Sequence, residues 1–189
     1  MIKKIAIFAS GSGSNFEAIV KACRERQLNA AVEICICDRP GAYVLERAKN
    51  HDIPAILVNP KDFPDKEHYE TFIADVLTEM EIDLVCLAGY MRIIGPTLLG
   101  RFKNKIINIH PSLLPAFKGA HAIRDALEYG VKVYGVTIHY VDETLDGGKI
   151  IAQEAFPYDG SNLEELEAKI HRVEHSLYPA TINRLTANK

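Results

Sequence analysis

Short apolar runs, each followed by a segment with helical periodicity, fill the first 110 residues of this 189-residue chain. The runs are nearly continuous and rich in β-branched residues, which is typical of strands buried on both faces of a sheet. Strands that alternate with helices predict a parallel sheet with right-handed crossovers. The predicted strands are Lys4–Ala9, Ala31–Cys37, Ala55–Val58, Leu84–Ala88 and Lys105–His110, and the predicted helices are Asn15–Gln27, Val44–Asn50, His68–Met80 and Pro96–Phe102.

The last third of the chain has a different pattern. Val131–Val141 and Lys149–Phe156 indicate two further strands, and Leu163–Leu185 indicates a long amphipathic helix. Asn162 is expected to cap this helix, because a glutamate follows three residues later. Pro179 is expected to kink or divide it, because proline lacks the amide proton that a helix interior uses.

These elements predict an α/β fold with a single open, mostly parallel, twisted sheet and helices on both faces. The first half resembles a Rossmann nucleotide-binding unit, and the second half is elaborated. We therefore expect one domain over residues 1–189, with a nucleotide-binding-like half at 1–104 and a second half at 105–189.

Composition excludes several classes of protein. Hydrophobic residues make up 48%, charged residues make up 25%, and the net charge is -3, so we expect a folded chain and not a disordered one. A pI near 6.2 gives no general reason to bind nucleic acid or an anionic membrane. No apolar run approaches the roughly 18 residues that span a bilayer. We expect a cytoplasmic monomer or homodimer that acts on small molecules, without a nucleic-acid or membrane partner.

The cysteines also favour a reducing compartment. The chain has four, none of them in a C-x-x-C pair, and three lie inside predicted strands. Buried free thiols are therefore expected in place of a disulfide framework. The four are Cys23, Cys35, Cys37 and Cys86.

The segment Ser10–Asn15 combines glycines, serines and an asparagine directly after the first strand. Glycines let backbone amides approach an anion, and the following helix N-terminus adds partial positive charge, which suits a phosphate. Phe16 stands where a dinucleotide fingerprint needs its third glycine, so a monophosphate fits better. The alternative is a plain turn in which Ser14 or Asn15 caps the helix.

Asn108 and His110 end the fifth predicted strand, two residues apart, so their side chains point the same way. An amide and an imidazole side by side can donate hydrogen bonds to a developing oxyanion. Asp146 lies in a Gly-containing loop after a later strand, and a carboxylate near His110 would favour the imidazolium form. The alternatives are a buried structural histidine and an ordinary Asp-Gly turn.

His171, Glu174 and His175 fall in one helical stretch. The two histidines are four residues apart, so a metal site is conceivable. The segment is not H-E-x-x-H, and we expect a solvated or partly buried helix face and no metal.

Three motifs resemble those of the folate-dependent formyltransferases. Ile107–Pro115, followed by Gly119, resembles the family signature, and Gly135–Ile151 resembles its second signature. The phosphate-type segment near the start has a counterpart in the family as well, so the resemblance covers essentially the whole chain. The resemblance implies transfer of a formyl group from the co-substrate 10-formyltetrahydrofolate to the amine of a phosphoribosylglycinamide, in purine biosynthesis. It also implies that 105–189 is the folate-binding and catalytic half.

Position by position, the resemblance implies a catalytic trio and two ligand sites. Lys66 stands where the family often has an arginine, and a lysine does not reproduce a forked contact. The implied catalytic residues are Asn108, His110 and Asp146; the implied substrate-binding residues are Gly13, Ser14, Asn15 and Glu174; the implied folate-binding residues are Lys66, Met91, Arg92, Ile93, Ile94, Asn108, Val141 and Asp142.

Two other functions remain open at this point. One is a formyl or hydroxymethyl transferase that acts on another amine, such as a nucleotide-sugar amine. The other is a non-catalytic nucleotide-binding module in which Asn108 and His110 are structural. Turnover with 10-formyltetrahydrofolate and a panel of amines separates them.

Overall fold

The computed structural model describes residues 2–187, whose strands form one seven-stranded sheet in the order β3-β2-β1-β4-β5-β6-β7. β1 to β5 run parallel, and β6 and β7 are antiparallel to their neighbours, so the predicted open, mostly parallel sheet is confirmed. The strands are β1 (Lys3–Ala9), β2 (Ala30–Cys37), β3 (Ala55–Leu57), β4 (Leu84–Leu87), β5 (Ile106–His110), β6 (Val133–Tyr140) and β7 (Ile150–Pro157).

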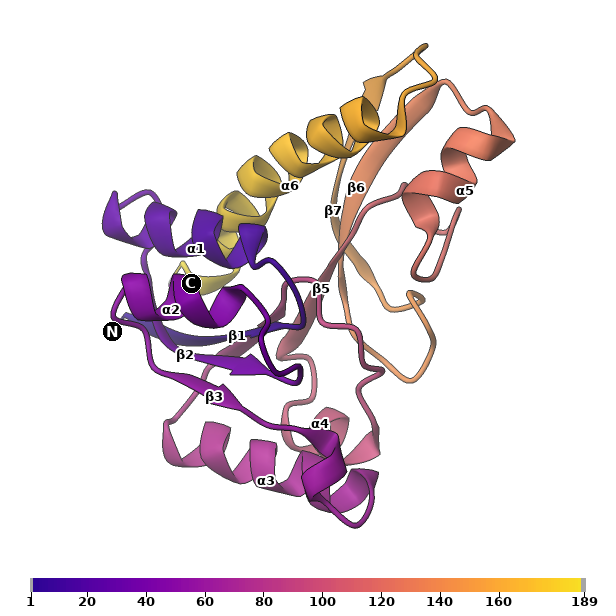
Figure 1. Cartoon of the computed structure of the whole chain (residues 1–189). Coiled ribbons are helices and arrows are strands. Elements are labelled where there is room, and N and C mark those ends of the chain that lie inside the picture. The colour runs from indigo at the N-terminus through magenta and orange to yellow at the C-terminus, as the bar shows by residue number, and fades with distance from the viewer. Residues whose placement is uncertain (1, 188–189) are drawn as a thin grey trace.

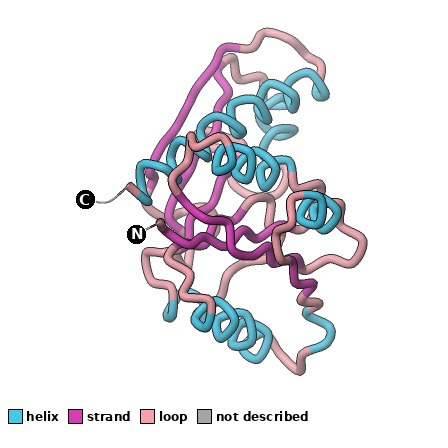
Figure 2. Tube along the Cα trace, turned by 90° about the vertical axis from the view of Figure 1, so that its left-hand side faces the viewer, coloured by secondary structure: helices cyan, strands magenta, loops and turns pink. Residues whose placement is uncertain are grey.

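Helices cover both faces of this sheet. α1, α2 and α6 lie over one face, and α3 and α4 lie over the other, whereas α5 stands beside β6 (Figure 1). Figure 2 shows the central strands between the two helical layers. The helices are α1 (Ser14–Arg24), α2 (Val44–Asn50), α3 (Lys66–Glu79), α4 (Pro96–Arg101), α5 (Ala122–Tyr129) and α6 (Leu163–Thr186), with a 3-10 turn η1 at Pro60–Asp62.

The alternation along β1 explains why its sequence is apolar throughout. Ile5 and Ile7 pack into the core beneath α1, α2 and α6, whereas Ala6 and Phe8 pack into the core beneath α3 and α4. All four are fully buried. A strand that serves two cores has no polar face, so chemistry is left to the residues beyond its end.

Three elements differ from the expectation. α5 and η1 were not among the predicted elements. The expected division of the last helix at Pro179 is wrong, since α6 continues through it to Thr186. Its expected cap is confirmed, because the Asn162 side chain accepts a hydrogen bond of 3.1 Å from the Glu165 amide.

Tyr178 fixes α6 to the sheet immediately before that proline. Its side chain is fully buried, and its hydroxyl donates to the carbonyl of Leu87 at 2.9 Å and lies 3.3 Å from that of Ile107. These carbonyls belong to neighbouring strands, β4 and β5. Tertiary contacts of this kind outweigh the loss of one helical hydrogen bond at Pro179.

Other sequence expectations concern cysteines and membranes. Among the described residues, Cys35, Cys37 and Cys86 are buried free thiols and Cys23 is a half-buried one, so free cysteines are confirmed. In the same part of the chain, no helix is both long enough and apolar enough to cross a membrane.

The hydroxyl of Tyr178 gives a test of this anchor. Tyr178→Phe keeps the shape of the ring but leaves two buried carbonyls without this donor, so we expect a loss of about 1–2 kcal/mol of unfolding free energy. Chemical denaturation measures it. Tyr129→Phe, at a side chain that is 81% exposed, is the control and is expected to be neutral. Equal effects of the two substitutions would refute the anchoring role.

Candidate active site

Asn108 and His110 lie at the carboxyl end of β5, where the antiparallel strand β6 returns beside them. Asn108 pairs with His139, and His110 pairs with Thr137. Because residues two apart in a strand point to the same face, the pairing brings Asn108, His110 and His139 together.

The amide of Asn108 is oriented by His139. Its Nδ2 lies 3.2 Å from His139 Nε2, and His139 Nδ1 lies 2.9 Å from the Tyr140 carbonyl oxygen. A carbonyl only accepts, so Nδ1 carries the proton and Nε2 of the neutral ring accepts from Asn108. Burial lowers the pKa of His139, which favours this neutral form. The second Nδ2 proton and Oδ1 of Asn108 are therefore left for a ligand.

His110 lies between a carbonyl and a carboxylate. Its Nε2 is 2.8 Å from the Phe117 carbonyl oxygen, and its Nδ1 is 3.6 Å from Asp146 Oδ2. Nε2 therefore donates to the carbonyl, and Nδ1 faces the acid. Protonation of Nδ1 would place the second proton of the imidazolium toward Asp146.

Asp146 is held by more than its own turn. Its backbone has a positive φ of 47°, as a tight loop requires, and its side chain is only 11% exposed. Oδ2 accepts a hydrogen bond of 2.8 Å from the Gly119 amide, and Oδ1 lies 3.9 Å from His139 Nε2. An ordinary Asp-Gly turn explains the φ angle but not these contacts with three other segments.

A second polar group lies where α1 meets α6. Glu174 Oε2 accepts from Asn15 Nδ2 at 3.1 Å and from His171 Nδ1 at 2.8 Å, and both Asn15 and Glu174 are buried. The hydrogen bond to Glu174 raises the pKa of His171. Buried Oδ1 of Asn15 has no hydrogen-bond partner among the described residues. A buried acceptor of this kind is costly unless a ligand or water donates to it.

The N-terminus of α1 has no side-chain cap. Gly13 occupies the cap position with φ 74°, and a Cβ there would lie 2.5 Å from a methyl carbon of Val44. The alternative in which Ser14 or Asn15 caps the helix is therefore wrong. The first amides of α1 are left free for an anion.

The expected folate residues fall into two groups. Lys66 and Met91–Ile94 line a cavity of about 540 Å³ between the start of α3 and the loop after β4. Val141 and Asp142 follow β6, where the Val141 amide donates to the Ile106 carbonyl at 2.9 Å. Hydrogen bonds from Thr144 lower the pKa of Asp142. Asn108 lies between these groups, because β5 separates β4 from β6.

His171 and His175 are stacked, with ring centroids 6.1 Å apart. Burial lowers the pKa of His175, in contrast to the raised pKa of His171. Within residues 2–187, no three or more His, Cys, Asp or Glu side chains are grouped to hold a metal ion.

Sequence reasoning did not identify His139 or His171 as parts of these groups. The place of His139 beside Asn108 depends on the register between β5 and β6. His171 lies three residues before Glu174 and on the same side of α6, so helical spacing is the signal that identifies it.

Comparison with known proteins identifies the class. The model of the formyl transferase family matches residues 3–182, and the chain belongs to that family. It is 50% identical over 185 residues to the phosphoribosylglycinamide formyltransferase of Bacillus subtilis (strain 168), covering 97% of this chain and 95% of that protein.

Solved structures agree with this. A phosphoribosylglycinamide formyltransferase from Bacillus halodurans superposes with a TM-score of 0.95 at 55% identity, covering 98% of this chain and 96% of that one. Glycinamide ribonucleotide transformylase 1 from Geobacillus kaustophilus superposes with a TM-score of 0.96 at 51% identity, covering 99% and 100%. The expected family and fold are confirmed.

Charges beside the phosphate-type loop tie it to α2. Glu17 of α1 lies 3.1 Å from Lys21, 3.2 Å from Arg47 and 3.0 Å from His51, and Arg47 Nε donates to the Ser12 carbonyl at 2.8 Å. Burial opposes ionisation of Glu17, but hydrogen bonds from its three partners outweigh it and lower the pKa from 4.5 to about 2.

The lowered pKa predicts a pH-dependent contribution to stability. Since the folded pKa of Glu17 lies below the unfolded one, its contribution is complete above about pH 4.5 and is lost as the pH falls toward about 2. We expect Glu17→Gln to cost about 2 kcal/mol at pH 7 and almost nothing near pH 2. Urea denaturation across this range tests it, with exposed Glu46→Gln as the control. A cost that does not change with pH would contradict the assignment.

Proposed function

We propose that this chain transfers the formyl group of 10-formyltetrahydrofolate to the amine of 5-phosphoribosylglycinamide, in de novo purine biosynthesis. The products are the formylglycinamide ribonucleotide and tetrahydrofolate. The observation that carries the proposal is the group Asn108, His110 and Asp146 at the carboxyl edge of the sheet, with His110 Nδ1 3.6 Å from the carboxylate. The names of relatives at 50% identity and above support the same reaction.

The N-terminus of α1 suits the substrate phosphate. Gly13, Ser14 and Asn15 offer uncapped amides, and Ser14 adds a hydroxyl donor. Buried Asn15 Oδ1 is placed to accept from a hydroxyl of the same substrate. We assign the phosphoribosyl part to this loop.

Glu174 suits the substrate amine. Its carboxylate is buried, and it already accepts from Asn15, which borders the proposed phosphate site. A substrate bound by its phosphate at the start of α1 would therefore bring its amine to this acid. Glu174 would accept a hydrogen bond from the amine and so direct the lone pair of the amine nitrogen toward the formyl carbon.

Asn108 and His110 suit the charge that develops on the formyl oxygen. The donor supplies a formyl carbon on N10; attack by the amine forms a new C–N bond and moves an electron pair to oxygen. Asn108 Nδ2 has one free proton for that oxygen, and protonated His110 adds positive charge beside it. Asp146 stabilises the imidazolium. Loss of the amine proton, gain of a proton by N10 and cleavage of the old C–N bond restore neutrality.

We assign the formyl donor to the loop after β4 and to the residues after β6. Met91–Ile94 would present backbone groups to the pterin on one side, with Val141 and Asp142 opposite. Lys66 and Arg92 border the 540 Å³ cavity and would attract the acidic tail of the folate. We thus propose that residues 105–189 form the catalytic half and share the folate site with Lys66 and Met91–Ile94 of residues 1–104, which also carry the phosphate side.

An amine panel tests the reaction. Release of tetrahydrofolate from 10-formyltetrahydrofolate is followed with 5-phosphoribosylglycinamide, with a nucleotide-sugar amine, and with no acceptor. We expect turnover with the first only, unchanged by EDTA because no metal is proposed. Turnover with the sugar amine would support a different transferase, and ligand binding without turnover would support a binding module. We further propose a cytoplasmic monomer or homodimer.

A substitution at the start of α1 tests the phosphate site. Ser14→Asp places a carboxylate in the first turn, which favours the helix but repels a phosphate. We expect the KM for 5-phosphoribosylglycinamide to rise about tenfold or more, with the KM for the formyl donor unchanged. Steady-state kinetics with each substrate varied measures both values, and Ser14→Ala is the milder control. Equal increases in both KM values would refute the assignment of the phosphate to this loop.

A double-mutant cycle tests the catalytic pair. We expect Asp146→Asn to lower kcat more than it weakens ribonucleotide binding, because the charge on oxygen exists only near the transition state. His110→Ala is expected to cost roughly 10²–10³-fold. The double variant is expected to be little worse than the worse single variant. His68→Ala removes an exposed histidine that also pairs with an aspartate, at 2.8 Å, and serves as the control. Additive losses would separate His110 from Asp146.

A further inference from the structure

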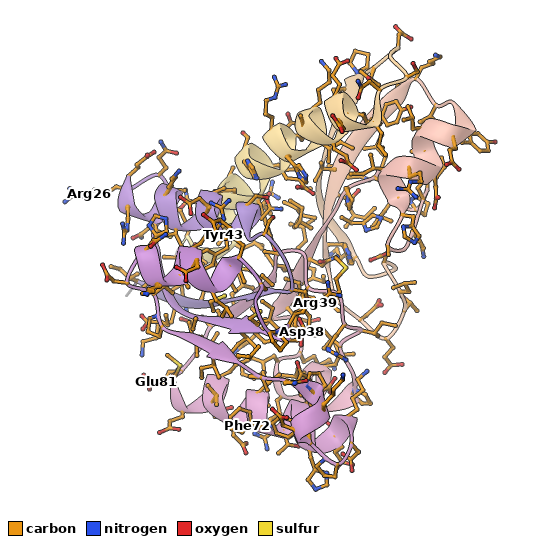
Figure 3. The ribbon with its side chains drawn as sticks, viewed as in Figure 1. Arg26, Asp38, Arg39, Tyr43, Phe72 and Glu81 are labelled. Carbon is orange, nitrogen blue, oxygen red and sulfur yellow. The ribbon has the colours of Figure 1, made fainter. Side chains whose placement is uncertain are left out.

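Two buried carboxylates from distant segments hold the loop that follows β4. Asp38 lies just beyond the end of β2, where Figure 3 labels it, and is 7% exposed. Glu70 lies on α3 and is 2% exposed. Neither acid belongs to the trio or to the group around Glu174.

Asp38 binds the first part of the loop. Its Oδ2 accepts from Arg92 Nε at 2.7 Å, and its Oδ1 accepts from the hydroxyl of Ser10 at 2.5 Å. The Ser10 oxygen in turn accepts from the Met91 amide at 2.9 Å, and the Ser10 amide donates to the Gly89 carbonyl at 3.1 Å. One acid thus fixes both the backbone at Met91 and the side chain of Arg92.

Glu70 binds the last part of the loop. Oε1 accepts from the Gly95 amide at 2.5 Å, and Oε2 accepts from the Leu98 amide at 3.2 Å in the first turn of α4. A Cβ on Gly95 would lie 2.7 Å from Oε1, so a glycine is what allows this close approach. Lys66 is 3.8 Å away and supplies a partial counter-charge.

The middle of the loop has little else to fix its shape. The side chains of Met91 and Ile93 are 62% and 64% exposed, whereas Tyr90 and Ile94 on either side of them are buried in the core beneath α3. Burying two carboxylates is costly unless each is fully hydrogen-bonded, and here every acid oxygen has a donor. The expense is consistent with a requirement for a fixed backbone between the two anchors.

We propose that Asp38 and Glu70 are positioning residues that hold Met91–Gly95 in the shape that receives the formyl donor. Both act through other groups: Asp38 through Ser10 and Arg92, and Glu70 through the amides of Gly95 and Leu98. Ser10 directly precedes the proposed phosphate loop, so the same contacts join the two ligand sites. The inference rests on the proposed function, because it assigns this loop to the formyl donor.

Isosteric amides test each acid without leaving a cavity. Asp38→Asn can keep its oxygen toward Ser10, but then turns an NH₂ group toward Arg92 Nε, so the arginine is released. Glu70→Gln can accept from only one of its two backbone amides with a single oxygen. Asp75→Asn is the control for Asp38, since Asp75 pairs with Arg101 on the surface, and exposed Glu67→Gln is the control for Glu70.

In kinetics we expect each variant to raise the KM for 10-formyltetrahydrofolate about tenfold, because a lost hydrogen bond to a charged group commonly has this effect. The KM for 5-phosphoribosylglycinamide is expected to stay within about twofold, and both controls are expected to match the parent. Equal increases in the two KM values, or none in either, would overturn the proposal.

Amide hydrogen exchange of the ligand-free protein gives a second readout that needs no turnover. We expect faster exchange in segment 89–98 of both variants, with protection elsewhere and the unfolding midpoint of the sheet retained. Unchanged exchange in this segment overturns the positioning role even if activity falls. If the parent protein shows no formyl transfer, the proposed function fails while exchange still decides whether the acids hold the loop. Should Glu70→Gln fail to fold, Asp38→Asn, which alters a loop residue, decides the outcome.

Discussion

Burial of both faces of the sheet is the constraint from which the site follows. β1, β2, β4 and β5 supply two apolar cores at once, so their side chains leave no room for polar groups between their ends. Polar residues collect where the strands end: Ser10 follows β1, Asp38 follows β2, and Asn108 and His110 lie within the last three residues of β5. Because these strands are parallel, all of these positions lie along one edge. The two proposed ligand sites are therefore adjacent because of the strand order and direction alone.

The change of direction at β6 brings the residues of the proposed catalytic group together. A sixth parallel strand would end beside β5 with its own carboxyl end, whereas antiparallel β6 brings its interior next to Asn108. His139 thereby lies within hydrogen-bond distance of the asparagine amide, and the loop to β7 returns Asp146 to His110. The four polar side chains thus come from one strand, its antiparallel neighbour and a loop. A one-residue slip between β5 and β6 would therefore turn His139 to the other face.

Periodicity and short spacings in the sequence predicted the features that depend only on neighbouring residues. The strands, most helices, the shared direction of Asn108 and His110, and the cap at Asn162 all follow from periodicity or short spacing, and the structure reproduces them. α5, a helix of eight residues, was not predicted, and the helix does not divide at Pro179 because Tyr178 holds it from outside. His139, Asp38 and Glu70 depend on register or on contacts between segments far apart in sequence. No single-segment pattern contains that information.

The histidines of the two polar groups have different neighbours, and this difference separates their proposed roles. His139 is neutral because burial dominates, so it serves as an acceptor that orients Asn108. The pKa of His171 is raised because its ring donates a hydrogen bond to Glu174, which favours the imidazolium form. His110 has a carbonyl on one nitrogen and a carboxylate near the other, which fixes where each proton lies. Three histidines can therefore perform three tasks, because each has a different neighbour.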